Sequence, residues 1–189
     1  VLSEVGGSGP LILIGVAAGA AAALRIAARS QKQVAGVVAV TPALGTAVEQ
    51  RDNVSKLADR IEREGIQVMM GMERTYPSRL REAPPDRWTE FRLRYMGNDP
   101  TSYAHLLRMV MDVDLSDDIG RIQCPALVIG GTLDIRPVDM MRTLAAQIPN
   151  GAVEEIDAGH FMPSQAPDLV ADAIERFVAA LPACATNGV

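Results

Sequence analysis

The chain has 189 residues, of which 48% are hydrophobic and 22% are charged, and its net charge is -5. So much apolar material excludes a disordered chain, and the length fits one globular domain of ordinary size. The acidic balance argues against nucleic acid as a partner, because phosphate backbones attract basic surfaces.

Cysteine usage and hydropathy exclude further classes. Cys124 and Cys184 lie far apart, which is typical neither of a disulfide framework nor of a zinc site. The longest apolar stretch, residues 11–24, is interrupted by glycines and is shorter than the roughly 20 residues of a membrane-spanning helix. No basic region precedes it, as it would in a signal peptide. We therefore expect a soluble, cytoplasmic protein with no membrane partner, metal or cofactor.

The N-terminal part predicts a strand–helix–strand unit. A short apolar run at Leu11–Ile14 follows a turn rich in glycine and predicts a buried strand. An alanine-rich helix is expected from there to Arg29, and the β-branched run Val34–Val40 predicts the second strand. Strands so connected are parallel, with a right-handed crossover.

The middle of the chain, residues 44–118, has no strand pattern and predicts a helical insertion. An amphipathic helix is expected over 54–65 and another over 103–110, and prolines divide the rest into short helices. Trp88, the only tryptophan, lies here among arginines. It is a candidate for contact with an anionic substrate, but the favoured interpretation of these arginines is a solvated helical face that pairs with neighbouring acids.

The remaining chain returns to alternating strands and helices. Strands are predicted over 126–129 and 153–156, and helices over 138–148 and 168–181. The chain thus divides into core units at 1–43 and 119–189, separated by the helical region 44–118.

Three candidate site residues follow predicted parallel strands, where open α/β sheets bind ligands: Ala17, Asp134 and His160. Ala17 is the centre of a Gly-x-Ala-x-Gly turn between strand and helix. With serine there, the turn would be a nucleophile elbow, whose central residue has strained backbone angles and whose flanking glycines avoid collisions. Nucleophile, acid and histidine follow one another in this chain order in α/β-hydrolases.

The Gly-Thr-Leu-Asp and Ala-Gly-His segments, with their strand context, resemble the α/β-hydrolase fold family. The resemblance implies an α/β fold with a mostly parallel sheet, flanking helices and a helical cap. Residues 98–103 and 114–125 look most like 3-oxoadipate enol-lactonase and related small-ester hydrolases. A small ester or lactone is then the expected substrate, with Asp134 and His160 catalytic and the Ala18 N–H as one oxyanion donor.

The sequence departs from the family pattern at three places. Ala17 has no nucleophilic atom, so it is either a replaced serine or a natural alanine. Pro137 follows Asp134 one residue sooner than usual. The resemblance begins at the family's fifth strand, so we expect four strands and an oxyanion-hole loop to be missing and another polypeptide segment to complete the sheet. Two alternatives stay open: a cofactor-free oxygenase or lyase using the His–Asp pair, and a non-catalytic binding protein.

Overall fold

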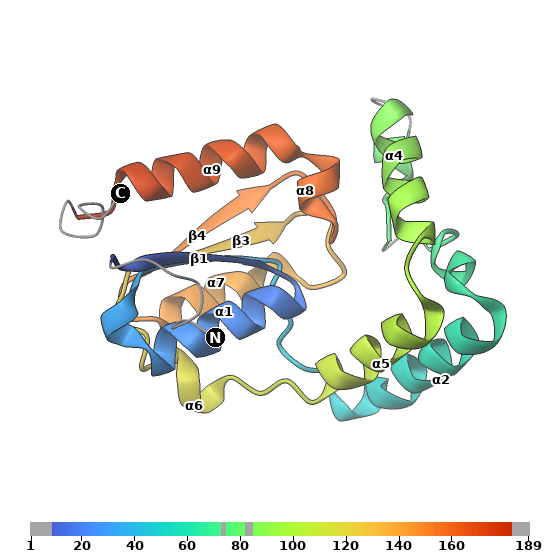
Figure 1. Ribbon diagram of the computed structural model, residues 1–189, viewed down its shortest axis with the longest axis horizontal. Helices are drawn as coiled ribbons and strands as arrows, with labels where there is room; N and C mark the ends of the chain where they lie inside the picture. Colours follow the sequence, from blue (N-terminus) through green and yellow to red (C-terminus); the bar gives the residue numbers. More distant parts are fainter. Residues whose placement is uncertain (1–8, 73–74, 82–84, 183–189) are drawn as a thin grey trace.

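A computed structural model of the chain describes residues 9–72, 75–81 and 85–182. Its centre is a sheet whose four strands are all parallel and lie side by side in chain order (Figure 1). This confirms the predicted parallel α/β architecture. The strands are β1 (Leu11–Val16), β2 (Val34–Val40), β3 (Ala126–Gly131) and β4 (Gly151–Ile156).

Helices cover both faces of the sheet. Figure 1 shows α1 and α7 on one face and α9 on the other. In β2, Val37 packs into the core shared with α1 and α7, whereas Val38 packs into the core shared with α9. Since successive side chains of a strand point to opposite faces, a strand buried on both faces is apolar throughout. The helices are α1 (Ala18–Arg29), α7 (Val138–Gln147) and α9 (Pro167–Ala179), with the short η2 (Gln31–Gln33) and α8 (Met162–Gln165).

Strand β1 lies at one edge of the sheet. Among the described residues it pairs with β2 alone, and its side chains Ile14 and Val16 are 53% and 40% exposed. The predicted second neighbour of this strand would have to come from outside the described residues. No helix in the described ranges has the length and apolarity needed to cross a membrane.

The segment between β2 and β3 is helical, as predicted, and has an aromatic core of its own. Tyr76 and Phe91 are both at most 6% exposed, and their ring centroids lie 5.0 Å apart. Arg108 fastens α5 to α2 by donating to Asp59 and Glu62. The elements are α2 (Val48–Glu64), η3 (Ile66–Met69), α3 (Ser78–Arg81), α4 (Pro85–Met96), α5 (Pro100–Met111) and α6 (Ser116–Ile119).

Some helix boundaries differ from the prediction. Helix α2 begins at Val48, earlier than expected, because its first turns are exposed and polar and carry no apolar periodicity. Helix α5 begins at Pro100 after Asp99, whose side chain accepts a hydrogen bond from the Ser102 N–H at 2.7 Å. The single-turn helices α6 and α8 are too short to show periodicity and were not predicted.

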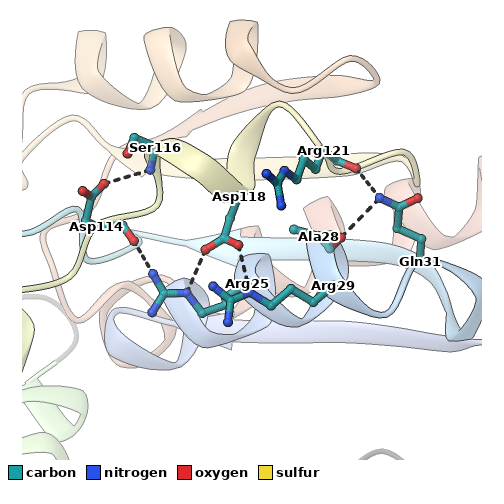
Figure 2. A network of polar contacts seen from close by, with 8 residues as sticks. All are labelled: Arg25, Ala28, Arg29, Gln31, Asp114, Ser116, Asp118 and Arg121. Atoms are coloured by element: carbon teal, nitrogen blue, oxygen red, sulfur yellow. Dashed lines mark hydrogen bonds and ion pairs between the residues drawn. The ribbon is translucent and has the colours of Figure 1, made fainter.

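A polar network fastens the end of the helical region back to the core (Figure 2). Asp118 in α6 is 3% exposed, and its carboxylate accepts hydrogen bonds from Arg25 Nε at 2.8 Å and Arg29 Nε at 3.0 Å. Arg25 also donates to the carbonyl oxygen of Asp114. Burial works to raise the pKa of Asp118, but the two guanidinium groups outweigh it and lower that pKa. These hydrogen bonds bind α6 to α1.

Candidate active site

The turn between β1 and α1 has the strain that the sequence predicts for its central residue. Ala17 has φ 50° and ψ -114°, a conformation that residues with a side chain rarely adopt. Backbone hydrogen bonds hold it there: its N–H donates to the Val40 carbonyl at 2.9 Å, and its carbonyl accepts from the Ala43 N–H at 3.0 Å. The end of β2 therefore supports the turn.

The two glycines that flank Ala17 have different roles. A Cβ on Gly15 would lie 2.3 Å from the carbonyl oxygen of Gly19, so a side chain there collides with backbone, as expected. A Cβ on Gly19 would meet nothing within 4 Å. The expectation that both glycines avoid collisions is therefore wrong for Gly19, since the space beside the start of α1 is open in the described chain.

The structure brings Asp134 and His160 together. His160 Nδ1 lies 3.1 Å from Asp134 Oδ2, within the distance expected for a hydrogen-bonded pair. The Asp134 side chain is 3% exposed and that of His160 is 19% exposed. The two loops that carry them also contact each other, because the Leu133 N–H donates to the Ala158 carbonyl at 3.1 Å. A Cβ on Gly131 would lie 2.3 Å from that same carbonyl oxygen, so glycine permits the approach.

Arg136 is a third polar residue at this pair, and it was not predicted from the sequence. Its Nη1 lies 3.5 Å from His160 Nδ1, and its backbone N–H donates to Asp134 Oδ1 at 3.2 Å. Burial works to raise the pKa of Asp134, but the hydrogen bond and charge of His160, together with Arg136, lower it below its usual range. Asp134 is thus held as a carboxylate, the form that accepts a hydrogen bond from a protonated Nδ1.

Thr41 is the second residue that the sequence analysis missed. It directly follows β2, has φ 43° and is 1% exposed. Its Oγ1 donates to the carbonyl oxygen of His160 at 3.4 Å, and its N–H donates to the Ile129 carbonyl at 2.9 Å. Since Ala17 bonds to Val40, the residue before Thr41, the end of β2 connects the strained turn to the histidine loop. The sequence showed only that a threonine directly follows the predicted strand Val34–Val40.

The remaining predicted site residues are Ala18 and Trp88. Ala18 is the first residue of α1, so its N–H belongs to the first turn, whose amides have no partner within the helix. Trp88 in α4 packs on Tyr76 and Phe91, with centroids 4.9 Å and 6.0 Å away. Phe91 in turn contacts Phe161, the residue after His160, at 5.1 Å. Within the described residues, no group of three or more His, Cys, Asp or Glu side chains could hold a metal ion.

Comparison with known proteins identifies the family and the fold of the chain. The profile of the Alpha/beta hydrolase family matches residues 1–173. A thermophilic esterase from Thermogutta terrifontis, solved with malate bound, is 26% identical, with a TM-score of 0.80 over 91% of this chain and 65% of its own. No curated protein sequence matches the chain.

Two further solved structures share the fold at lower identity. The enol-lactonase from Burkholderia xenovorans LB400 is 23% identical, with a TM-score of 0.77 over 88% of this chain and 64% of its own. MenH from S. aureus is 20% identical, with a TM-score of 0.78 over 90% of this chain and 68% of its own. The chain thus spans a little under two thirds of the esterase and of the enol-lactonase. The solved structures share the fold, and the family match over residues 1–173 shows that the chain belongs to the alpha/beta hydrolase family.

Proposed function

We propose that this fold serves the hydrolysis of a small ester or lactone by acyl transfer, with residue 17 at the nucleophile position. The observation that carries the proposal is the 3.1 Å contact between Asp134 and His160. Both residues and the strained turn at Ala17 follow the C-terminal ends of parallel strands of one sheet. An esterase and an enol-lactonase among the similar structures support the substrate class.

Each residue has a distinct part in the proposed reaction. A serine hydroxyl at position 17 would attack the carbonyl carbon of the substrate while His160 Nε2 takes its proton. Asp134 would hold the Nδ1–H tautomer and stabilise the imidazolium. His160 would then give the proton to the leaving oxygen, and water would release the acyl group by the same steps. The Ala18 N–H would bind the developing oxyanion, an interaction typically worth about 2.7–4 kcal/mol.

The alanine at position 17 bears directly on activity. Without an oxygen there, no acyl intermediate forms, so we infer that the chain as given is inactive as an esterase. A second candidate function is favoured by the same fact: Asp134 and His160 remain in contact although residue 17 has no hydroxyl. Such a pair can abstract a proton without a nucleophile, as in a cofactor-free oxygenase or lyase. A non-catalytic binding protein is the remaining alternative.

Ala17→Ser tests the proposal directly. We expect it to create hydrolysis of p-nitrophenyl acetate, whereas Ala22→Ser, the same change at an exposed position of α1, should create none. Adding His160→Ala should remove nearly all the new activity, because such residues act as a unit. A folded Ala17→Ser protein without activity, in the presence of any segment needed to complete the sheet, would favour the cofactor-free or binding alternatives.

Three further assignments belong to the same proposal. We propose that residues 44–118 act as a cap between core units 1–43 and 119–189, which the contact of Phe161 with Phe91 supports. Trp88, behind Phe91, would then line the substrate side of that cap. The exposed apolar edge of β1 supports a further polypeptide segment that completes the sheet. The cytoplasm is the proposed location, because two distant cysteines are not the framework of a secreted domain.

A further inference from the structure

A buried amide side chain holds the residue before His160. Gln165 in α8 is 6% exposed, and its Oε1 accepts a hydrogen bond from the Gly159 N–H at 2.7 Å. Gly159 is itself buried, so this N–H has no access to water and needs a protein partner. The backbone at His160 is therefore fixed on its N-terminal side by one side chain.

The other end of the same amide reaches the helical region. Gln165 Nε2 donates to the carbonyl oxygen of Thr75 at 3.4 Å, and Thr75 is 1% exposed. Two residues further on, Pro77 packs against the histidine loop: a Cβ on Gly159 would lie 2.9 Å from Pro77 Cγ. Because an N–H only donates and a carbonyl only accepts, these two partners fix which way the amide points.

The residue after His160 is also held by the helical region. The ring centroid of Phe161 lies 5.1 Å from that of Phe91 and 5.2 Å from that of Tyr95, both in α4. The Phe161 ring is edge-on to the His160 ring, with a centroid distance of 5.3 Å. Both chain neighbours of His160 are thus bound to the segment between β2 and β3. The sheet contributes the contacts of Thr41 and Asp134.

We propose that Gln165 is a positioning residue that couples the helical region to His160. It connects Gly159 to Thr75, so the position of the turn before α3 sets the backbone position from which the imidazole reaches Asp134. This role rests on the proposed function, because it gives the helical region control over the general base. Without the amide, the imidazole samples more than one orientation and more than one tautomer.

Histidine ¹⁵N spectra of the unaltered Ala17 chain test the coupling without any turnover. The sequence has two histidines, and His105, which is 68% exposed on α5, is an internal reference. We expect His160 to be a single Nδ1–H tautomer. His105 Nε2 lies 3.8 Å from Glu62 Oε1, so His105 has its own environment far from the histidine loop and should give the same signals in every variant. Gln165→Met, which keeps the length but removes both hydrogen bonds, should convert His160 to a mixture while leaving His105 unchanged.

Hydrogen exchange at the Gly159 amide supplies the second measurement. We expect slow exchange in the unaltered chain, at least tenfold faster exchange in Gln165→Met, and near-normal exchange in Gln165→Glu, which keeps an acceptor for that N–H. Ile122→Val, a core change at a fully buried residue outside the histidine loop, controls for general loss of stability. Fast exchange of Gly159 in the unaltered chain would overturn the inference even if Gln165→Met does not fold.

Measurements of kcat and KM distinguish a failure of this inference from a failure of the proposed function. In an active Ala17→Ser background, Gln165→Met should lower kcat about tenfold with less than a twofold change in KM. Gln165→Glu keeps the acceptor for Gly159 but loses the donor to Thr75, so it should recover only part of kcat. If Ala17→Ser is inactive, the proposed function fails while the tautomer and exchange results still decide the role of Gln165. Full recovery of kcat in Gln165→Glu, which lacks the bond to Thr75, or no more effect of Gln165→Met than of Ile122→Val, would overturn the coupling.

Discussion

Asp118→Asn is the sharpest test of how the helical region is fastened to the sheet. The substitution keeps the shape of the side chain but removes its charge. The carboxylate is 4% exposed and accepts from Arg25 Nε at 2.8 Å and from Arg29 Nε at 3.0 Å (Figure 2). An asparagine offers one oxygen to two guanidinium groups and turns an N–H₂ toward the other, so one hydrogen bond is lost and one contact becomes repulsive.

The expected loss in the free energy of unfolding lies between two limits. Removing one partner of a buried ion pair costs about 3–5 kcal/mol, whereas an exposed pair is worth about 0.2–1 kcal/mol. Asp118 is buried, but Arg25 and Arg29 are 41% and 63% exposed, so water screens their side of the interaction. We therefore expect a loss of about 2 kcal/mol, which lowers the Tm of a chain of this length by about 4–8 °C.

The effect should depend on pH with a definite sign. The pKa of Asp118 is lowered in the folded chain, because the two arginines outweigh the opposing effect of burial. Its contribution is therefore present above the unfolded pKa of about 3.9 and is lost as the pH falls through the folded value. The difference between the unaltered chain and Asp118→Asn should be full at pH 7 and shrink below about pH 4.

Thermal unfolding followed by circular dichroism at several pH values measures this difference. Glu64→Gln is the control, since it removes an exposed pair with Arg60 at 2.9 Å and should cost less than about 0.5 kcal/mol. Equal stability of Asp118→Asn and the unaltered chain at pH 7 would refute the reasoning. A difference that stays constant into acid would show that the lost interaction is not the charge.

The remaining predictions concern the strained turn and the edge of the sheet. Gly15→Ala should destabilise the chain by about 1–3 kcal/mol in urea unfolding, because its Cβ would lie 2.3 Å from a backbone oxygen. Gly19→Ala should be neutral or should stabilise the chain by up to about 1 kcal/mol, because its Cβ meets nothing within 4 Å. The reverse order of the two stabilities would contradict the geometry. On size exclusion, the chain alone should self-associate through β1, and Ile14→Lys should reduce this more than Val48→Lys, the same change on α2. A compact monomer with two-state unfolding would refute the need for a further strand.

The strands were predictable because their burial dictates their composition. Val34–Val40 is apolar at nearly every position, since β2 is buried on both faces, and its observed bounds equal the predicted ones. β3 and β1 run longer than predicted because each ends on residues that the sequence analysis assigned to a turn. Gly130 and Gly131 continue the pairing with β4, as far as Gly131 opposite Ile156. A glycine marks a turn only where no neighbouring strand pairs with it.

The candidate site was predictable only as far as short motifs reach. The strain at Ala17 and the contact of Asp134 with His160 follow from a turn motif and from loops after adjacent parallel strands. Arg136 and Thr41 were missed because their importance arises from loop conformation and from a contact across 119 positions of the chain. Gln165 was missed for the same reason: its partner Thr75 is 90 positions away.

The aromatic core of the helical region has a consequence for motion. It is a cluster separate from the two cores that line the sheet, and Phe161 connects it to the loop after β4. Segments with their own core open as cooperative units, at a lower free energy than global unfolding. When this unit opens, Phe161 loses its contact with Phe91 while the sheet stays folded. The loop that carries His160 would then be held from the sheet side alone, by Thr41 and Asp134.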